Sequence, residues 1–227
     1  MARTNSTPDT ATRQRLLEIA GEVFADQGYR SATIRDICAR AGANVAAVNY
    51  HFGDKEALYR DVLEHAHAQA LRRYPPDLGT APDASAEERL RAFVRAFLLR
   101  LLDDGGPAWL GKLMAREMIE PTGALDELVE RNMRPMFRRL VGLVGEIAGP
   151  SADPQRVRLS AQSIVAQCVF YRHAEECLRR LGKDAESGKG QVERVAEHVS
   201  RFSLAAIRDL APDERSTVGR GSGGERS

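Results

Sequence analysis

Residues 43–52, ANVAAVNYHF, combine side chains that hydrogen-bond to nucleic acids with side chains that are unusually small. An asparagine can make a bidentate contact with adenine, and alanine or valine can touch the methyl group of thymine. Small side chains also allow a helix to lie deep in the DNA major groove. The residue types therefore indicate a helix that reads base edges, and they offer nothing suited to catalysis.

Two short helices joined by a glycine turn are needed to position these side chains. Thr33 and Asp36 have the spacing of a capping box, and Gly42 is typical of a helix C-terminus. Asn44 and Asp54 are good N-cap residues for the two helices that follow. This arrangement predicts a helix-turn-helix unit, whose second helix enters the major groove. Periodicity alone favours the alternative of two core helices in an all-helical bundle.

Apolar residues recur at helical spacing along almost the whole chain, which predicts an all-α protein. The first helix is expected to end at Gly28, and the fourth to end near Tyr74 before two prolines. Pro135 is expected to kink or break a long segment that runs from about Gly123 to Ala148. Further helices are expected after the Ser85–Glu88 capping box, over 109–120, from Asp153 to about Leu181, and from about Gln191 to Leu210.

Composition places the protein in a broad class without defining a function. Of the 227 residues, 43% are hydrophobic and 29% are charged, which is ordinary for a soluble globular protein. The net charge of +1 does not by itself indicate a nucleic-acid binder. No apolar run approaches the roughly 20 residues that span a bilayer, and the N-terminus does not resemble a signal peptide. We therefore expect a cytoplasmic protein without membrane contact.

Motifs for enzymes, metals and cofactors are missing from the sequence. The segment GPAWLGKL, residues 106–113, has phosphate-loop spacing, but Leu113 replaces the hydroxyl residue that binds magnesium. The three cysteines form no metal-binding pattern, and Cys168 and Cys177 are expected to fill apolar helical positions. We expect no enzyme activity, no metal and no cofactor.

The segment TIRDICARAGANVAAVNYHFGDKEALY resembles the DNA-binding signature of the TetR family of bacterial transcriptional regulators. The resemblance covers roughly residues 10–60 and rests on Thr33, Ala41, Gly42, Tyr50, His51, Phe52 and Lys55. The segments REMIEPTGALDELVERNMRPMF and QSIVAQCVFYRHA extend it to about residue 182 and resemble the CerR/CecR-like branch.

The resemblance implies a three-helix DNA-binding domain followed by a larger helical domain for ligand binding and dimerisation. We expect a flexible arm at 1–9, the DNA-binding domain at 10–54, the second domain at 55–210 and a disordered tail at 211–227. It also implies a repressor that binds a palindromic operator as a homodimer and is released by a small-molecule effector. The alternative is a helical ligand-binding protein of the same fold that has lost sequence-specific DNA binding.

Roles in DNA binding are carried over by position. The resemblance implies base-edge contacts from the start and middle of the second short helix: Asn44, Val45, Ala46, Ala47 and Asn49. It implies phosphate contacts from Thr33, Tyr50, His51 and Lys55, whereas Arg35 is expected to reach a guanine or a phosphate. The chain departs from the family pattern at Val45–Ala47 and at Asn49, so fewer hydrogen bonds are expected from the helix start.

Two further sets of residues are expected in the second domain. A pocket lined by apolar and aromatic side chains is predicted, with these candidates: Phe93, Phe97, Trp109, Met114, Met118, Phe137, Gln162 and Tyr171. Plain core packing is the alternative for each of them. The last helix has a heptad seam of Val192, Ala196, Val199, Ser203, Ala206 and Leu210, predicted to form a dimer interface. Ordinary burial within one chain is the alternative here.

Overall fold

The computed structural model describes residues 8–102, 106–181 and 189–210, and within these ranges it contains helices and no strand. The all-α prediction is confirmed. The helices are α1 (Pro8–Ser31), α2 (Ile34–Ala41), α3 (Val45–Phe52), α4 (Lys55–Arg73), α5 (Ala86–Leu102), α6 (Ala108–Ile119), α7 (Gly123–Leu128), the π-helical turn η1 (Val129–Met133), α8 (Arg134–Ala148), α9 (Pro154–His173), α10 (Glu175–Leu181) and α11 (Lys189–Arg208).

The turns around α2 and α3 form where the sequence predicts them. The Thr33 hydroxyl accepts a hydrogen bond from the Asp36 amide, and the Asn44 and Asp54 side chains cap α3 and α4 in the same way. Gly42 adopts a left-handed conformation with φ of 60°, which favours glycine because a Cβ atom would be strained there. Local sequence therefore determines where the two short helices begin and end.

The kink or break expected at Pro135 appears as the π-helical turn η1, which ends at Met133, two residues before the proline. Proline has no amide hydrogen and its ring collides with the preceding turn of an α-helix. A wider π-helical turn relieves that conflict while the chain stays helical. The segment from Gly123 to Ala148 consequently continues through α7, η1 and α8 without a non-helical residue between them.

One predicted helix boundary is wrong, and one expected segment overlaps a helix by two residues. The helix expected to reach Leu181 stops at His173, because Ala174 leaves helical geometry with ψ of 10°, and α10 then restarts at Glu175. The flexible arm expected at 1–9 overlaps α1, which begins at Pro8, a residue whose fixed φ suits the first helical position. The rest of that arm and the tail expected at 211–227 lie outside the described residues.

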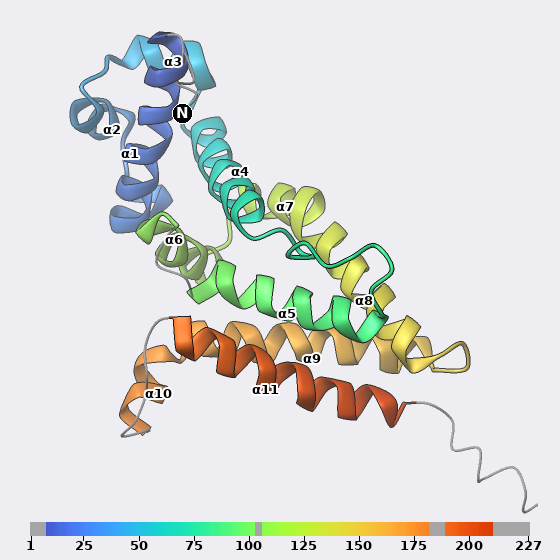
Figure 1. Ribbon diagram of the computed structural model, residues 1–227. Coiled ribbons are helices and arrows are strands. Elements are labelled where there is room, and N and C mark those ends of the chain that lie inside the picture. The colour runs from blue at the N-terminus through green and yellow to red at the C-terminus, as the bar shows by residue number, and fades with distance from the viewer. Residues whose placement is uncertain (1–7, 103–105, 182–188, 211–227) are drawn as a thin grey trace, which may run out of the picture.

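The buried apolar side chains form two clusters. One joins α1–α4 to Leu113 of α6 and to Ala124 and Leu128 of α7. The other lies between α5, α8, α9 and α11. Figure 1 shows the first group as a unit above the stacked helices α5, α9 and α11, with α4 descending from one to the other. The first core thus extends past the domain boundary expected at residue 54, through α4 into α6 and α7.

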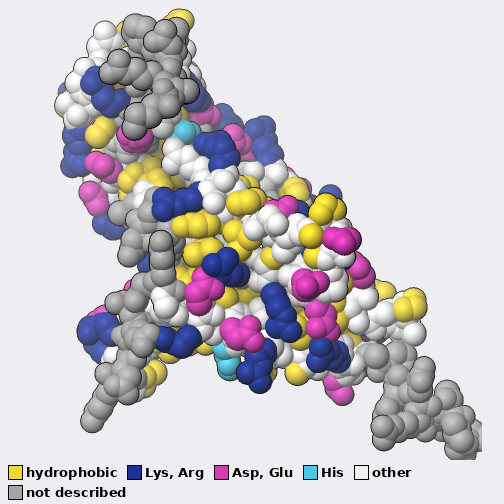
Figure 2. Space-filling view, viewed as in Figure 1, with side chains coloured by type: hydrophobic (Ala, Val, Ile, Leu, Met, Phe, Trp, Pro, Cys, Tyr) yellow, Lys and Arg dark blue, Asp and Glu magenta, His cyan; other side chains and the backbone are white. Residues whose placement is uncertain are grey.

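The surface of the second cluster carries opposite charges side by side, as Figure 2 shows over α5 and α11. Arg95 of α5 pairs with Glu193 of α11 at 2.6 Å, and Arg208 of α11 pairs with Glu87 of α5 at 2.6 Å. No helix within the described residues has the length and apolar character that would let it cross a membrane.

The structure corrects two predictions about buried positions. Val192, Ala196, Val199 and Ser203 are at most 5% exposed because this side of α11 packs into the core of its own chain. Four of the six seam residues are therefore unavailable to a partner, whereas Ala206 is exposed and Leu210 is partly buried. Cys168 is buried as expected, but Cys177 is exposed, because α10 buries no residue.

Candidate nucleic-acid interface

Helix α3 has an exposed face of small side chains, which is called its open face below, and a buried face on the opposite side. Val48 and Phe52 are buried in the first apolar cluster and hold the helix in place. Four predicted base-edge residues are exposed, whereas Ala47 is partly buried and packs against the core. The exposed set is Asn44, Val45, Ala46 and Asn49. The open face is free of bulky side chains until Tyr50, which is 77% exposed.

Asn44 and Asn49 differ in how many of their side-chain hydrogen-bonding groups remain available to contact DNA. The Asn44 side-chain oxygen accepts the Ala47 amide at 2.7 Å, so its acceptor is already used by the helix cap. A bidentate contact with adenine needs both a donor and an acceptor. The Asn49 side chain makes no hydrogen bond within the described part of the chain, so its amide donor and its carbonyl acceptor both remain available.

The predicted phosphate-binding residues differ in exposure and in the contacts that they already make within the protein. Tyr50 is exposed, and Arg35 near the start of α2 is exposed without an ion pair among the described residues. The Thr33 hydroxyl is engaged with Asp36 as the α2 cap. The Lys55 ammonium donates to the Arg30 carbonyl oxygen at 3.2 Å and lies 4.7 Å from the centre of the Tyr29 ring. Burial lowers the pKa of Lys55, and part of its hydrogen-bonding capacity is used inside the protein.

His51 was expected to contact a phosphate, but its side chain is largely buried against α1. Its side chain is 8% exposed and faces Asp9 of α1, with Nε2 3.6 Å from a carboxylate oxygen. A direct phosphate contact would require the imidazole to leave this site. The physical reason is the helical angle: α3 buries Val48 and Phe52, and His51 lies at the edge of that same side against α1.

Arg15 is a further candidate for a contact with DNA, and the sequence patterns did not identify it. Its guanidinium reaches the turn between α2 and α3, 3.4 Å from the Gly42 carbonyl oxygen. On the sequence it is only one of several exposed charges on α1. Only the packing of α1 across the turn brings its guanidinium to the residues that precede α3.

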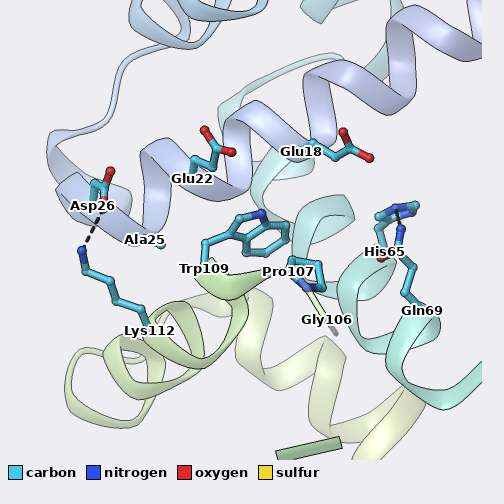
Figure 3. Close-up of a pocket in the computed structure, with 10 residues that line it drawn as sticks. All are labelled: Glu18, Glu22, Ala25, Asp26, His65, Gln69, Gly106, Pro107, Trp109 and Lys112. Atoms are coloured by element: carbon cyan, nitrogen blue, oxygen red, sulfur yellow. Dashed lines mark hydrogen bonds and ion pairs between the residues drawn. The ribbon is translucent and has the colours of Figure 1, made fainter. Parts of the chain in front are cut away.

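Helix α6 holds the end of α1, as Figure 3 shows. The Trp109 ring packs directly on Gly21, where an added Cβ would lie 2.4 Å from it. Lys112 pairs with Asp26 at 2.8 Å, and Arg116 donates to the carbonyl oxygens of Ala25 and Asp26 at 3.0 Å each. These contacts join the helices that carry α2 and α3 to the rest of the chain.

A buried hydrogen-bonded group completes this junction. The Tyr59 hydroxyl of α4 donates to the Glu117 carboxylate of α6 at 2.5 Å, and the Thr122 amide and hydroxyl donate to the same carboxylate. Glu117 is 1% exposed and Tyr59 is 2% exposed. Burial, followed by the bond to Glu117, raises the pKa of Tyr59, so its hydroxyl stays a donor at physiological pH. This group fixes the position of α4 relative to α6 and α7.

The predicted pocket residues are not gathered into one site. Trp109 and Met114 pack on the first cluster, whereas Phe93, Phe97, Phe137 and Tyr171 belong to the second. Met118 and Gln162 are exposed. A cleft of about 650 Å³ lies between α1, α4 and α6 (Figure 3), and Trp109 is the one predicted residue that lines it. Glu18, Glu22 and the hydrogen-bonded pair His65 and Gln69 also line this cleft.

Comparisons with known proteins agree with this geometry. Residues 16–62 match the family model described as bacterial regulatory proteins, tetR family, and residues 86–207 match the C-terminal domain of the HTH-type transcriptional dual regulator CecR. CecR of Shigella flexneri is 29% identical over 174 residues, which cover 73% of this chain and 78% of that protein. The HTH-type transcriptional repressor NicS of Pseudomonas putida is 28% identical over 169 residues, covering 70% and 75%.

A solved structure shows the same fold. It is a bacterial regulatory protein in the tetR family from Rhodococcus RHA1, with a TM-score of 0.61, 20% identity, and coverage of 91% of this chain and 98% of that one.

Proposed function

This chain belongs to the TetR family of bacterial DNA-binding transcriptional regulators, and on that premise we propose that it is a repressor that binds a palindromic operator as a homodimer and is released by a small-molecule effector. The open face of α3 is the observation that carries the proposal. Its exposed small residues and the unengaged Asn49 amide suit insertion into a major groove. NicS, a relative over most of the chain, is named a repressor.

The experiment that tests this proposal is selection of operator sequences from randomised duplex DNA at two salt concentrations. We expect enrichment of a palindrome whose half-sites lie about 34–36 Å apart, one helical turn, and an affinity that falls steeply with salt. The absence of any enriched sequence at low salt, with the protein folded, would favour the alternative of a ligand-binding protein that no longer reads DNA.

Asn49→Ala is expected to remove discrimination at one adenine in each half-site. The loss should be about 1–3 kcal/mol, or roughly 5- to 150-fold, because a bidentate amide contact disappears. Competition binding with operators substituted at each position measures it. Gln155→Ala, which removes an exposed amide from α9, is the matched control. An unchanged preference at every position would show that Asn49 reads no base.

A second copy of this chain is the proposed partner of α9 and α11. These two helices lie side by side (Figure 1). They expose Leu159, Phe170 and Phe202, which are 52%, 56% and 59% exposed, respectively. Large apolar side chains in this position are typical of a covered interface. This face replaces the buried seam of α11 as the proposed dimer surface.

Phe170→Glu is expected to weaken the dimer by at least about 30-fold, the effect of losing a central aromatic contact of about 2 kcal/mol. Sedimentation equilibrium measures the dissociation constant. Ile119→Glu, on α6 and 80% exposed, is the control and should leave the dimer intact. Equal dimer constants for both variants would place the interface elsewhere.

A further inference from the structure

The cleft between α1, α4 and α6 has a size that suits a small molecule. Its volume of about 650 Å³ lies within the usual range of sites for drug-sized ligands, about 300–1,000 Å³. Figure 3 shows that three helices form its walls. Helix α1 contributes a row of acidic residues, α4 contributes His65 and Gln69, and α6 contributes Trp109 and Lys112.

The acidic residues of the cleft lie along one face of α1. Glu18, Glu22 and Asp26 follow each other at intervals of four residues, over which a helix rises about 6 Å. Carboxylates at this spacing are neighbours on the helix surface and repel each other, which destabilises the helix. A positive charge in the cleft would relieve this repulsion.

One positive charge is already present at the edge of the cleft. The Lys112 ammonium binds the Asp26 carboxylate at 2.8 Å, and this hydrogen bond lowers the pKa of Asp26. The row of carboxylates thus already binds one cation, which the protein itself supplies. Glu18 accepts a hydrogen bond from the Gln14 amide at 3.1 Å, which brings no charge. Three carboxylates and one ammonium leave the described lining with a surplus of negative charge.

The charges around the cleft favour a cation near Glu22. Burial, followed by the charge of Arg72, lowers the pKa of His65, so the imidazole is mostly neutral at pH 7. A cation at the His65 end would be repelled by Arg72. Residues 103–105, which precede Gly106 of the lining, lie outside the described residues; their sequence is Asp, Asp and Gly, which adds no basic side chain.

Trp109 supplies aromatic surface next to these carboxylates. Figure 3 shows its ring between α1 and α6, below Glu22 and Glu18. The ring is held in place because it packs on Gly21, where an added Cβ would lie 2.4 Å away. Among aromatic side chains, tryptophan attracts cations most strongly. A fixed indole beside carboxylates suits a ligand that combines a positive charge with an apolar body.

We propose that this cleft is the effector site and that the effector is an organic cation with an aromatic body, whose charge lies beside Glu22 and whose apolar part packs near Trp109. This inference rests on the proposed function, since it names the location and the chemical class of that effector. The carboxylates give a neutral molecule of the same shape no charge attraction, and they repel an organic acid.

An occupant of the cleft acts on the contacts that join α1 to α6. Its positive group competes with Lys112 for Asp26, and its apolar body lies between the two helices. Helix α1 shares an apolar core with α2 and α3, so a shift of α1 relative to α6 carries the open face of α3 with it. The effector releases DNA because it binds the shifted arrangement more tightly than the operator-bound one.

The first test measures binding to the DNA-free protein by tryptophan fluorescence and calorimetry. Trp109 is the only tryptophan of the chain, so its emission reports on this cleft. The probes are phenethylamine and 4-phenylbutylamine, each paired with the alcohol of the same carbon skeleton, together with 4-phenylbutyrate and spermidine. We expect at least one amine to bind at least about 5-fold more tightly than its alcohol, because the ring and the carboxylates both attract its charge.

Two variants test the role of Glu22. Glu22→Gln keeps the size of the side chain and removes its charge, so the preference for the amine over its alcohol should fall to about twofold or less. Glu120→Gln, exposed at the end of α6 and outside the cleft, is the matched control and should keep the full preference. Circular dichroism of both variants checks that each one is folded.

Four outcomes of the first test would overturn the inference. They are equal binding of amines and alcohols, an amine preference that Glu22→Gln retains, tighter binding of 4-phenylbutyrate or spermidine than of either amine, and heat of binding without any change in the emission of Trp109. Tighter binding of spermidine would show that charge alone, without an aromatic body, is recognised.

The second test measures operator affinity with and without the tighter-binding amine. We expect the amine to weaken operator binding by at least about 10-fold in the wild type, within the usual range of coupling between two sites, and by less in Glu22→Gln. Comparing the two proteins on the same DNA excludes a direct effect of the amine on the DNA. An operator affinity that the amine leaves unchanged would overturn the assignment as effector site. If no operator is selected and amine binding still depends on Glu22, the cation site stands and the proposed repressor fails.

Discussion

Ala46→Glu is expected to abolish operator binding while leaving the fold intact. Ala46 is exposed near the start of α3, on the face that also carries Val45 and Asn49. In the proposed complex a glutamate there would extend toward the base edges and bring a negative charge between two rows of phosphates. Repulsion between like charges at an interface costs several kcal/mol, so the affinity should fall by at least about 100-fold. Fluorescence anisotropy with the selected operator measures this loss at fixed salt.

Two further variants separate charge from bulk. Ala81→Glu adds the same charge at an exposed position between α4 and α5 and should keep full affinity. Ala46→Lys adds similar bulk with the opposite charge. If bulk prevents close approach of α3, this variant should retain salt-dependent binding to any DNA and lose its preference for the operator. Operator affinity of Ala46→Glu within about threefold of the wild type would mean that α3 does not enter the groove.

Glu117→Ala is expected to cause the largest loss of stability from a single side chain. The substitution leaves the Tyr59 hydroxyl and the Thr122 amide without their acceptor in a site that water does not reach. Breaking such a buried group costs about 3–5 kcal/mol. For a chain of this size that corresponds to a fall in melting temperature of roughly 10 °C, measured by circular dichroism.

A double-mutant cycle with Tyr59→Phe isolates the contribution of the hydrogen bond. Because Tyr59 and Glu117 touch each other, their separate losses should not add, and the coupling should exceed about 1 kcal/mol. Glu120→Ala removes an exposed carboxylate at the end of the same helix and is the matched control. If Glu117→Ala and Glu120→Ala lower the melting temperature equally, the buried group does not hold α4 to α6.

The sequence by itself determined the local structure around α2 and α3. Thr33, Asn44 and Asp54 each cap a helix through the amide three residues further along the chain, and Gly42 turns the chain through its own backbone freedom. Pro135 similarly acts on the turn immediately before it. These interactions join residues that are adjacent in the chain, so the amino-acid pattern is sufficient to predict them.

Only the tertiary structure decided which side of each helix faces inward. Helix α11 has apolar residues on more than one side, and packing against α5 and α9 buries the heptad seam while leaving Phe202 exposed. The pocket candidates divide between two cores because α6 joins α1, whereas α5 joins α11. Periodicity identifies an apolar strip, but the partner of that strip is set by contacts between distant segments.

Contacts between distant segments also decide which polar side chains are buried. His51 is shielded because α1 crosses its edge of α3, and Glu117 is buried because Tyr59 and Thr122 surround it. The cost of burying a charge depends on everything that replaces water around it, and that environment exists only once the chain has folded.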